Sequence, residues 1–323
     1  MWCKFASIAV IAAAFCLPAG NKAAAQTNIQ FGVTSAVASN APHFIAMELG
    51  FYKEQGLNVT WISAGSANNV IQQVAAGSLN MGWAATDQAI RAIMRGAPVR
   101  IIAGAGAVPV FRVLGAKDVK TWADLKGKRI SVGGPSDQTL YFFRVMARKN
   151  GLGDKDYDFV YGGSTPDRFA HLLSNTVGAS VLTNPLDFTA LDQGYPDLGL
   201  VSDVFKTWTQ NNIEVNTSWA KANRPAVVAF LKAHIKAINY FYDPRNEASV
   251  LAIMQKVTKD TEATTKRTYA YYIKEGVLAK SGELSLPGIQ AVLDALREFG
   301  DVKQPISTGD LVDASFLQEA AGK

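Results

Sequence analysis

Short apolar runs alternate with longer amphipathic segments through the first hundred residues that follow position 28. The apolar runs have the length and residue types of strands, and the segments between them have the period of helices. The strand ranges are 29–34, 57–62, 80–84 and 99–103, and the helix ranges are 41–49, 65–77 and 86–95. Repeated strand–helix units favour a parallel sheet with helices on both faces. This part of the chain is therefore predicted to be α/β.

The same alternation begins again after residue 115, in a smaller copy. Its strand-like runs are 130–132, 158–161 and 179–182, its helical segments are 136–150, 166–174 and one that starts at Pro185, and a short segment, 198–202, follows. Val110–Leu114 and Ile213–Thr217 read as extended connectors on either side of this copy. Two connectors between two α/β blocks predict two lobes joined by a two-segment hinge, with a cleft between them.

Beyond Ser218 the pattern is almost wholly helical. The predicted helices are 225–242, 246–257, 261–273 and 286–299. Periodicity alone does not determine which lobe these helices cover.

The first 25 residues have the layout of a secretory signal peptide. Lys4 supplies a positive start, Phe5 to Leu17 form an apolar run, and Ala23 to Ala25 are the small residues that signal peptidase cleaves after. The apolar run is shorter than the ~20 residues that a membrane crossing needs. We therefore expect cleavage after Ala25 and export to the periplasm, with a short membrane-anchoring helix as the alternative.

Composition excludes several classes of protein. Hydrophobic residues make up 48% of the chain and charged residues 18%, which is unlike a disordered protein. The formal charge of +5 falls to +3 when Lys4 and Lys22 leave with the signal peptide. No basic run suggests contact with nucleic acid. Both cysteines, Cys3 and Cys16, lie in the leader, so the exported chain is expected to lack disulfides and cysteine metal ligands.

Ligands of parallel α/β sheets lie beyond the carboxyl ends of the strands, against helix N-termini. The strand-to-helix turns therefore hold the candidate ligand-binding residues. They are Ser35, Asn40, His43, Gly65, Ser66, Thr86, Asp87, Ser136, Asp137, Gln138, Thr139 and Asn184. Phe111 and Trp208, next to the connectors, are candidates for stacking on an organic group.

Each candidate also has a structural interpretation. Ser66, Thr86 and Ser136 suit helix N-caps, although a cap can face a cleft as well. Asp137 suits a cap, or it favours a ligand with a cationic or N–H group. The remaining alternatives are a surface position for His43, a turn position for Asn184 and core packing for Phe111 and Trp208.

Motifs of enzymes are lacking. The chain has no Gly-x-Ser-x-Gly, His-Glu-x-x-His or phosphate-loop pattern, and His43, His171 and His234 are far apart in sequence. Gly104 to Pro109 begins like a dinucleotide fingerprint but ends in proline, so it is interpreted as a chance match. No catalytic residue, cofactor or metal site is predicted.

A specific combination of motifs starts at residues 41–59, where Gly50-Phe51-Tyr52 and Gly56-Leu57-Asn58-Val59 follow a helix that carries Ala46. The further motifs are Gly65, Ala75-Ala76-Gly77, Gly82, Gly96-Ala97-Pro98-Val99, residues 122–130 (WADLKGKRI) and Pro185. Over nearly all of residues 28–275 the chain resembles the SsuA/TauA/NMT1-THI5-like family of periplasmic solute-binding proteins. These serve ABC importers for alkanesulfonates, taurine, nitrate, thiamine-precursor pyrimidines and some aromatic acids.

The resemblance implies the type II periplasmic binding protein fold. Residues 26–112 and 216–323 would form lobe 1, including the C-terminal helices, and residues 113–215 lobe 2. The lobes would close on one small solute, and the closed monomer would dock on a membrane permease, its one link to the membrane. A small organic anion is the expected solute.

Three alternatives stay open. One is a nitrogenous ring such as a thiamine-precursor pyrimidine as the solute, and another is a sensor instead of an importer as the partner. The third is an exported enzyme on the same scaffold. The eukaryotic pyrimidine synthases of the superfamily depend on a cysteine-rich motif, which residues 26–323 lack.

Overall fold

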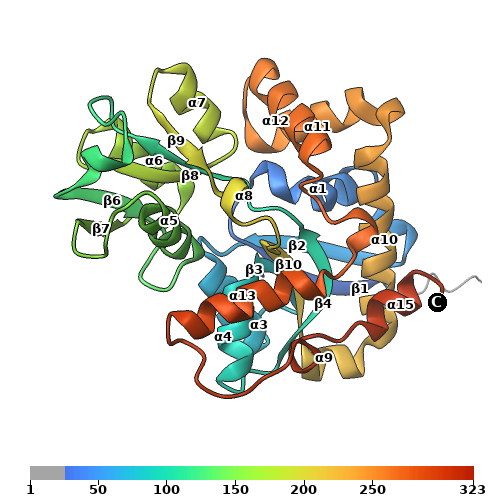
Figure 1. Ribbon diagram of the computed structural model, residues 1–323. Coiled ribbons are helices and arrows are strands. Elements are labelled where there is room, and N and C mark those ends of the chain that lie inside the picture. Colours follow the sequence, from blue (N-terminus) through green and yellow to red (C-terminus); the bar gives the residue numbers. More distant parts are fainter. Residues whose placement is uncertain (1–25) are drawn as a thin grey trace, which may run out of the picture.

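Two five-stranded sheets, each flanked by helices, form the two lobes of the molecule (Figure 1). The computed structural model describes residues 26–323. The first sheet has the order β2-β1-β3-β10-β4 and the second has the order β7-β6-β8-β5-β9. The strands of the first sheet are β1 Thr27–Val33, β2 Leu57–Ser63, β3 Met81–Ala85, β4 Val99–Gly106 and β10 Asn211–Asn216. Those of the second sheet are β5 Phe111–Gly115, β6 Lys128–Val132, β7 Tyr157–Tyr161, β8 Ala179–Thr183 and β9 Asp197–Leu200.

Both sheets are mixed, whereas the strand–helix pattern predicted parallel strands alone. β10 runs antiparallel to β3 and β4, and β5 runs antiparallel to β8 and β9. These two strands are also the segments that were predicted to be extended connectors. Each is the first strand that the chain forms after it crosses to the other lobe, so it enters that sheet against the direction of its neighbours.

The crossings between the lobes consequently lie just before the predicted connectors. One is residues 107–110, between β4 and β5, and the other is residues 205–210, before β10. Gln210 joins the two, since its N–H donates to the Gly106 carbonyl at 2.9 Å and its Oε1 accepts from the Val110 N–H at 2.9 Å. Hydrogen bonds therefore join the two crossing segments where they leave the first sheet.

Helices cover both faces of each sheet. In the first lobe they are the 3-10 turn η1 Ala38–Asn40 and helices α1 Ala41–Glu48, α2 Phe51–Glu54, α3 Ala67–Ala76 and α4 Thr86–Met94. In the second they are η2 Trp122–Leu125, α5 Gln138–Lys149, α6 Thr165–Leu173, α7 Leu186–Asp192 and α8 Val201–Val204. Pro42 lies in the first turn of α1, where its missing N–H costs nothing.

The helices that begin at residue 217 pack largely against elements of the first sheet's lobe. They are α9 Thr217–Ala222, α10 Arg224–Tyr242, η3 Pro244–Asn246, α11 Glu247–Thr258, α12 Glu262–Glu275, η4 Lys280–Gly282, α13 Leu286–Glu298, α14 Thr308–Leu311 and α15 Ser315–Ala320. In Figure 1, α10 and α11 lie against α1, and α13 lies across α4. None of the helices within residues 26–323 has the length and apolar character that crossing a membrane requires. The predicted signal peptide lies outside the described residues.

Two histidines are buried in the core of the first lobe. His43 Nδ1 lies 2.9 Å from the Tyr52 hydroxyl, and the rings of Trp83 and Phe230 flank His234. Burial lowers the pKa of His43 to about 3, with a smaller contribution from repulsion by His234, and it lowers the pKa of His234 to about 4. Both imidazoles are therefore neutral in the folded protein at physiological pH.

Acid is expected to destabilise the protein through these histidines. Below pH 6.5 the unfolded chain binds a proton at His234 that the folded chain refuses until about pH 4, so the free energy of unfolding falls as pH falls. In His234→Phe, the decrease in the free energy of unfolding between pH 7 and pH 5 should be smaller by about 2 kcal/mol than in the unaltered protein. Urea unfolding at the two pH values measures it, and an unchanged loss would show that His234 accepts a proton in the fold.

Candidate functional site

A cleft of about 880 Å³, counted with its open mouth, lies between the two lobes. The turns at the carboxyl ends of β1, β2 and β3 form one wall, and those after β6, β7 and β8 form the other. The lining residues are Thr34, Ser35, Val37, Ser39, Asn40, Gly65, Ser66, Ala67, Trp83, Ala85, Phe111, Asp137, Gln138, Thr139, Gly163, Ser164, Thr165, Pro166, Arg168, Thr183, Asn184, Gln210, Asn211 and Tyr272. Both lobes and the hinge thus contribute to one concave surface.

Helix N-termini from both lobes face this space. Ser66 caps α3 by accepting from the Asn69 N–H at 3.2 Å, and Asp137 caps α5 by accepting from the Thr139 N–H at 2.9 Å. Ser164 caps α6 in the same way. The capping interpretation of Ser66 and Asp137 is therefore confirmed, and both caps also line the cleft. Partial positive charge at such helix ends favours an acceptor or an anion.

Arg168 carries a full positive charge beneath this wall. Its side chain is 4% exposed, and it donates to the Val181 carbonyl at 2.7 Å, the Gly163 carbonyl at 2.5 Å and the Thr165 hydroxyl at 2.8 Å. All three partners are uncharged oxygens. Burial lowers the pKa of this guanidinium, although Asp137 and Asp167 oppose that effect. The arginine therefore holds the loop before α6 in place and leaves its charge available to the cleft.

Two buried amide oxygens in the wall lack partners among the described residues. They are Oδ1 of Asn40 and Oδ1 of Asn184. The Asn184 amide has a fixed orientation, because its Nδ2 donates to both carboxylate oxygens of Asp187, at 2.9 and 3.1 Å. Burial raises the pKa of Asp187 to about 6, so this carboxylate is mostly ionised at neutral pH. Asn184 Oδ1 is consequently a hydrogen-bond acceptor in the cleft.

Aromatic side chains complete the lining. Trp83 comes from β3, Phe111 from the start of β5 and Tyr272 from α12, and their exposed fractions are 2%, 6% and 1%. Burial raises the pKa of the Tyr272 hydroxyl well above its ordinary value. These rings give the cleft an apolar surface, which an organic solute would contact and a small inorganic ion would not.

Nine of the fourteen predicted site residues lie in this lining. They are Ser35, Asn40, Gly65, Ser66, Phe111, Asp137, Gln138, Thr139 and Asn184. The turns that follow parallel strands supplied all but Phe111, because strand ends of one sheet meet at the same edge.

Four others lie behind the first turn of α5, around a second cavity near the hinge. Asp87, Ser136 and Trp208 line it. Thr86 is the neighbour of Asp87 in the chain but does not line the cavity. Its hydroxyl donates to the Thr209 carbonyl at 2.8 Å and accepts from Asn212 Nδ2 at 2.7 Å. Thr86 and Ser136 are also not N-caps, since Ala85 and Asp137 hold those positions.

The expected place of His43 at the mouth of the cleft is wrong. The residue is fully buried in α1 and bound to Tyr52, so its ring faces the core. Pro42 marks the start of the helix correctly. The spacing of residues does not show which face of the helix meets the core, and in the structure this face includes His43.

Sequence reasoning missed Trp83, Pro166, Arg168, Gln210, Asn211 and Tyr272. Pro166 and Arg168 lie in the first turn of the predicted helix 166–174, and Trp83 lies in the predicted strand 80–84, which ends shortly before the candidates Thr86 and Asp87. An extension of the candidate set by one helical turn or a few strand positions would have included them. Tyr272 had no such signal. It reaches the cleft because α12 folds back over the first lobe.

Contacts between the lobes hold the cleft in the arrangement seen here. The Ser136 carbonyl of the second lobe accepts from Gln88 Nε2 and from Arg91 Nη1 of α4, both at 2.7 Å. On another side, Arg267 of α12 binds Asp192 of α7 at 2.8 Å and lies over the Phe188 ring. Within residues 26–323 no three His, Cys, Asp or Glu side chains gather as a metal-ligand set.

The chain has distant relatives in sequence. The chain is 23% identical over 250 residues to a 4-amino-5-hydroxymethyl-2-methylpyrimidine phosphate synthase of Candida albicans, covering 72% of this chain and 73% of that protein. It spans 62% of the length of the Saccharomyces cerevisiae synthases that it also matches.

The solved structures that share the fold include two binding proteins. The alkanesulfonate-binding protein SsuA from Xanthomonas axonopodis pv. citri, bound to MOPS, superposes with a TM-score of 0.70 at 20% identity, covering 92% of this chain and 97% of that one. The periplasmic nitrate-binding protein NrtA from Synechocystis PCC 6803 gives 0.77 at 17% identity, covering 92% and 89%.

The model of the NMT1/THI5-like family matches residues 38–248, which is more than half of the chain and includes most of the cleft wall. The family predicted from the glycine and Asp-Leu-Lys-Gly-Lys motifs is thus confirmed. With two lobes in the arrangement of periplasmic binding proteins and a cleft between them, this chain belongs to the NMT1/THI5-like family.

Proposed function

We propose that the protein is the solute-binding component of an ABC importer and captures a small organic anion between its lobes. The observation that carries the proposal is the convergence of capped helix N-termini from both lobes on one cleft, above the buried guanidinium of Arg168. Helix ends and this charge together stabilise a negative group. Trp83, Phe111 and Tyr272 would cover an organic part.

Capture works by closure. A solute that touches the N-terminus of α3 at Ser66 on the first lobe and that of α6 at Ser164 on the second binds the closed arrangement better than an open one, and it shifts the population accordingly. The Ser136 carbonyl then accepts from Gln88 and Arg91 across the gap. The closed form would be the one that a membrane permease recognises, and a sensor that uses the same form is the alternative partner.

A nitrogenous ring is a second candidate solute. The acceptors Asn40 Oδ1 and Asn184 Oδ1 are unpaired among the described residues, and a solute with N–H groups would satisfy them. The carboxylate of Asp137, which lines the same cleft, would also accept from such a group. The yeast relatives act in pyrimidine synthesis by their names, which agrees with this chemistry.

Binding without chemical change is part of the proposal. The ionisable side chains in the lining are Asp137, Arg168 and Tyr272, and Asp137 Oδ1 is held by Thr139 while Arg168 is held by main-chain oxygens. Such groups orient a solute and do not pair a nucleophile with a base. We further propose that the exported protein acts as a monomer in the periplasm.

A thermal-shift screen of residues 26–323 tests the proposal. Alkanesulfonates, nitrate, aromatic acids and pyrimidines are offered singly, and one of these classes should raise the melting temperature by mass action. Mass spectrometry should recover that compound unchanged after long incubation. If no class raises the melting temperature, the proposed solutes are wrong; if the compound is converted, the protein is an enzyme.

Closure is tested with the solute from that screen. Arg91→Ala removes one of the two hydrogen bonds from α4 to the Ser136 carbonyl, so affinity should fall several-fold. Arg95→Ala, one turn further along and exposed, is the matched control and should leave affinity unchanged. Equal affinity in both variants would show that this contact does not stabilise the closed form.

A further inference from the structure

A second cavity of about 670 Å³ lies behind the ligand cleft, and the proposed solute does not occupy it. Its walls come from α4 of the first lobe, from α5 of the second, from Trp208 in the crossing segment and from the end of α13. Asp137 and Gln138 line both spaces, so the first turn of α5 separates them. We call this space the rear cavity.

Three buried polar atoms of the rear cavity have no hydrogen-bond partner among the described residues, although one of them, Nε of the partly exposed Arg144, lies 3.9 Å from Asp154 Oδ1. They are Asp87 Oδ1, Arg144 Nε and Trp208 Nε1. The side chains of Asp87 and Trp208 are 3% and 5% exposed, so bulk water does not compensate them. Unpaired buried groups of this kind are costly and rare in folded proteins. A cavity that collects three of them presents polar groups that a bound molecule would satisfy.

The two donors and the acceptor belong to different parts of the wall. Trp208 Nε1–H and Arg144 Nε–H require an acceptor, and a carboxylate suits the charge of Arg144. Asp87 Oδ2 already accepts from Gln88 and Arg91, which leaves Oδ1 for a further donor. Burial raises the pKa of Asp87 to about 6, and a cation beside it would favour the ionised form.

One part of the wall is apolar and aromatic. The Tyr141 ring stacks on Trp208, with centroids 5.6 Å apart, and meets the edge of Phe299 at 4.7 Å. Leu140, Ala295 and Leu296 extend this apolar part, and polar residues such as Arg91, Gln138 and Asp301 line the rest. The apolar part suits an apolar or aromatic side group.

We propose that the rear cavity binds a small zwitterion with an apolar side group, such as an apolar amino acid. Its carboxylate accepts from Trp208 Nε1 and Arg144 Nε, and its ammonium group donates to Asp87 Oδ1. Since Asp87 belongs to the first lobe and Arg144 to the second, the occupant binds the closed arrangement better than an open one. It therefore acts as a positive effector of solute capture.

The indole N–H resonance of Trp208 reports occupancy directly. In ¹⁵N-labelled residues 26–323, the peak is assigned by its loss in Trp208→Phe, which keeps an aromatic ring in the stack. Addition of L-leucine or L-phenylalanine to about 10 mM should shift it, since millimolar affinity suffices at that concentration. N-acetyl-L-leucine and L-leucinamide, which each lack one charge, should bind at least tenfold more weakly than L-leucine.

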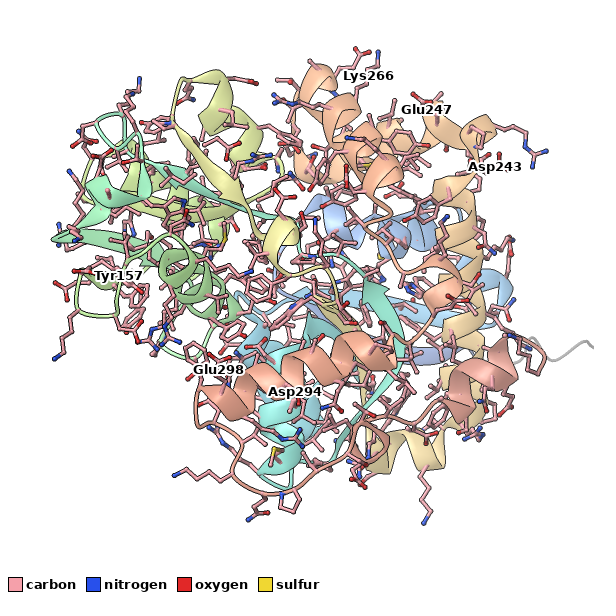
Figure 2. The ribbon with its side chains drawn as sticks, in the orientation of Figure 1. Tyr157, Asp243, Glu247, Lys266, Asp294 and Glu298 are labelled. Carbon is pink, nitrogen blue, oxygen red and sulfur yellow. The ribbon has the colours of Figure 1, made fainter. Side chains whose placement is uncertain are left out.

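A pair of arginine variants on α5 locates the bound amino acid. Arg144→Gln removes a donor of the cavity and should weaken binding by about tenfold or more. Arg148→Gln makes the same change one turn further on, at a half-exposed side chain that pairs with Glu298 near the end of α13 (Figure 2). It should leave the affinity unchanged within a factor of two.

Three results would overturn the proposal. The first is a Trp208 peak that neither amino acid moves and that shows only hydrogen exchange with water, because the cavity would then hold water alone. The second is equal binding of the charge-blocked compounds. The third is an amino acid whose affinity Arg144→Gln leaves intact, because it would then bind in the main cleft. None of these results depends on the identity of the transported solute.

Discussion

Replacement of Arg168 by methionine should lower the free energy of unfolding by about 3 kcal/mol. The change leaves the Val181 and Gly163 carbonyls without the donors that satisfy them in a buried place. It also removes the positive charge beneath the cleft. Affinity for an anionic solute should therefore fall by at least tenfold, which is the effect of losing one charge-assisted interaction.

Urea unfolding and titration calorimetry measure the two effects separately. Arg129→Met is the matched control, because Arg129 lies in the same lobe, is exposed and donates to the Thr176 carbonyl alone. It should cost less than about 1 kcal/mol and leave solute affinity unchanged. If Arg168→Met unfolds like the control, the arginine is not part of the framework of the cleft. If stability falls while affinity stays, its charge does not act on the solute.

Replacement of Gly104 by alanine should destabilise the first lobe by about 3 kcal/mol or more. A Cβ at this position would lie 1.9 Å from the Glu283 carbonyl oxygen and 2.9 Å from its carbon. Main-chain atoms have no alternative rotamer, so the segment 277–283 must move away from β4. The same segment is tied there by Ala107 N–H to the Val277 carbonyl at 2.8 Å and by Ala279 N–H to the Ala105 carbonyl at 2.9 Å.

The displacement should also affect the cleft, since residue 277 follows α12, which carries Tyr272. Gly134→Ala is the control, because nothing lies within 4 Å of the added atom, and it should leave the unfolding midpoint nearly unchanged. Denaturant unfolding with tyrosine and tryptophan fluorescence follows both variants. A Gly104→Ala protein as stable as the control would mean that the C-terminal segment adapts at little cost.

Gly104 also has a structural role in the segment Gly104–Pro109, which was interpreted as a chance match to a dinucleotide fingerprint. Gly104 to Gly106 resemble the start of a dinucleotide fingerprint because close approach of main chain requires glycine in both cases. Here the approaching chain is the C-terminal segment of the protein itself, with Leu278 bridged to Gly106.

The order and limits of most strands and helices followed from the sequence, because apolar period and capping residues act locally. Ser66 and Asp137 illustrate this, since each both begins a helix and faces the cleft. The sequence alone also identified the family, since the glycine turns and the run at residues 122–130 that carry the resemblance are local features of the chain.

Tertiary structure decided what local patterns do not contain. The direction of β5 and β10 depends on which side of a sheet the chain enters after crossing between lobes. Three features depend on how helices pack against segments that are distant in the sequence. They are the inward orientation of His43, the burial of Arg168 and the position of Tyr272 of α12 in the cleft. Local sequence fixes the period of a helix but not the partner that its faces meet, and for this reason the polar groups of the cleft and of the rear cavity emerged only in the folded molecule.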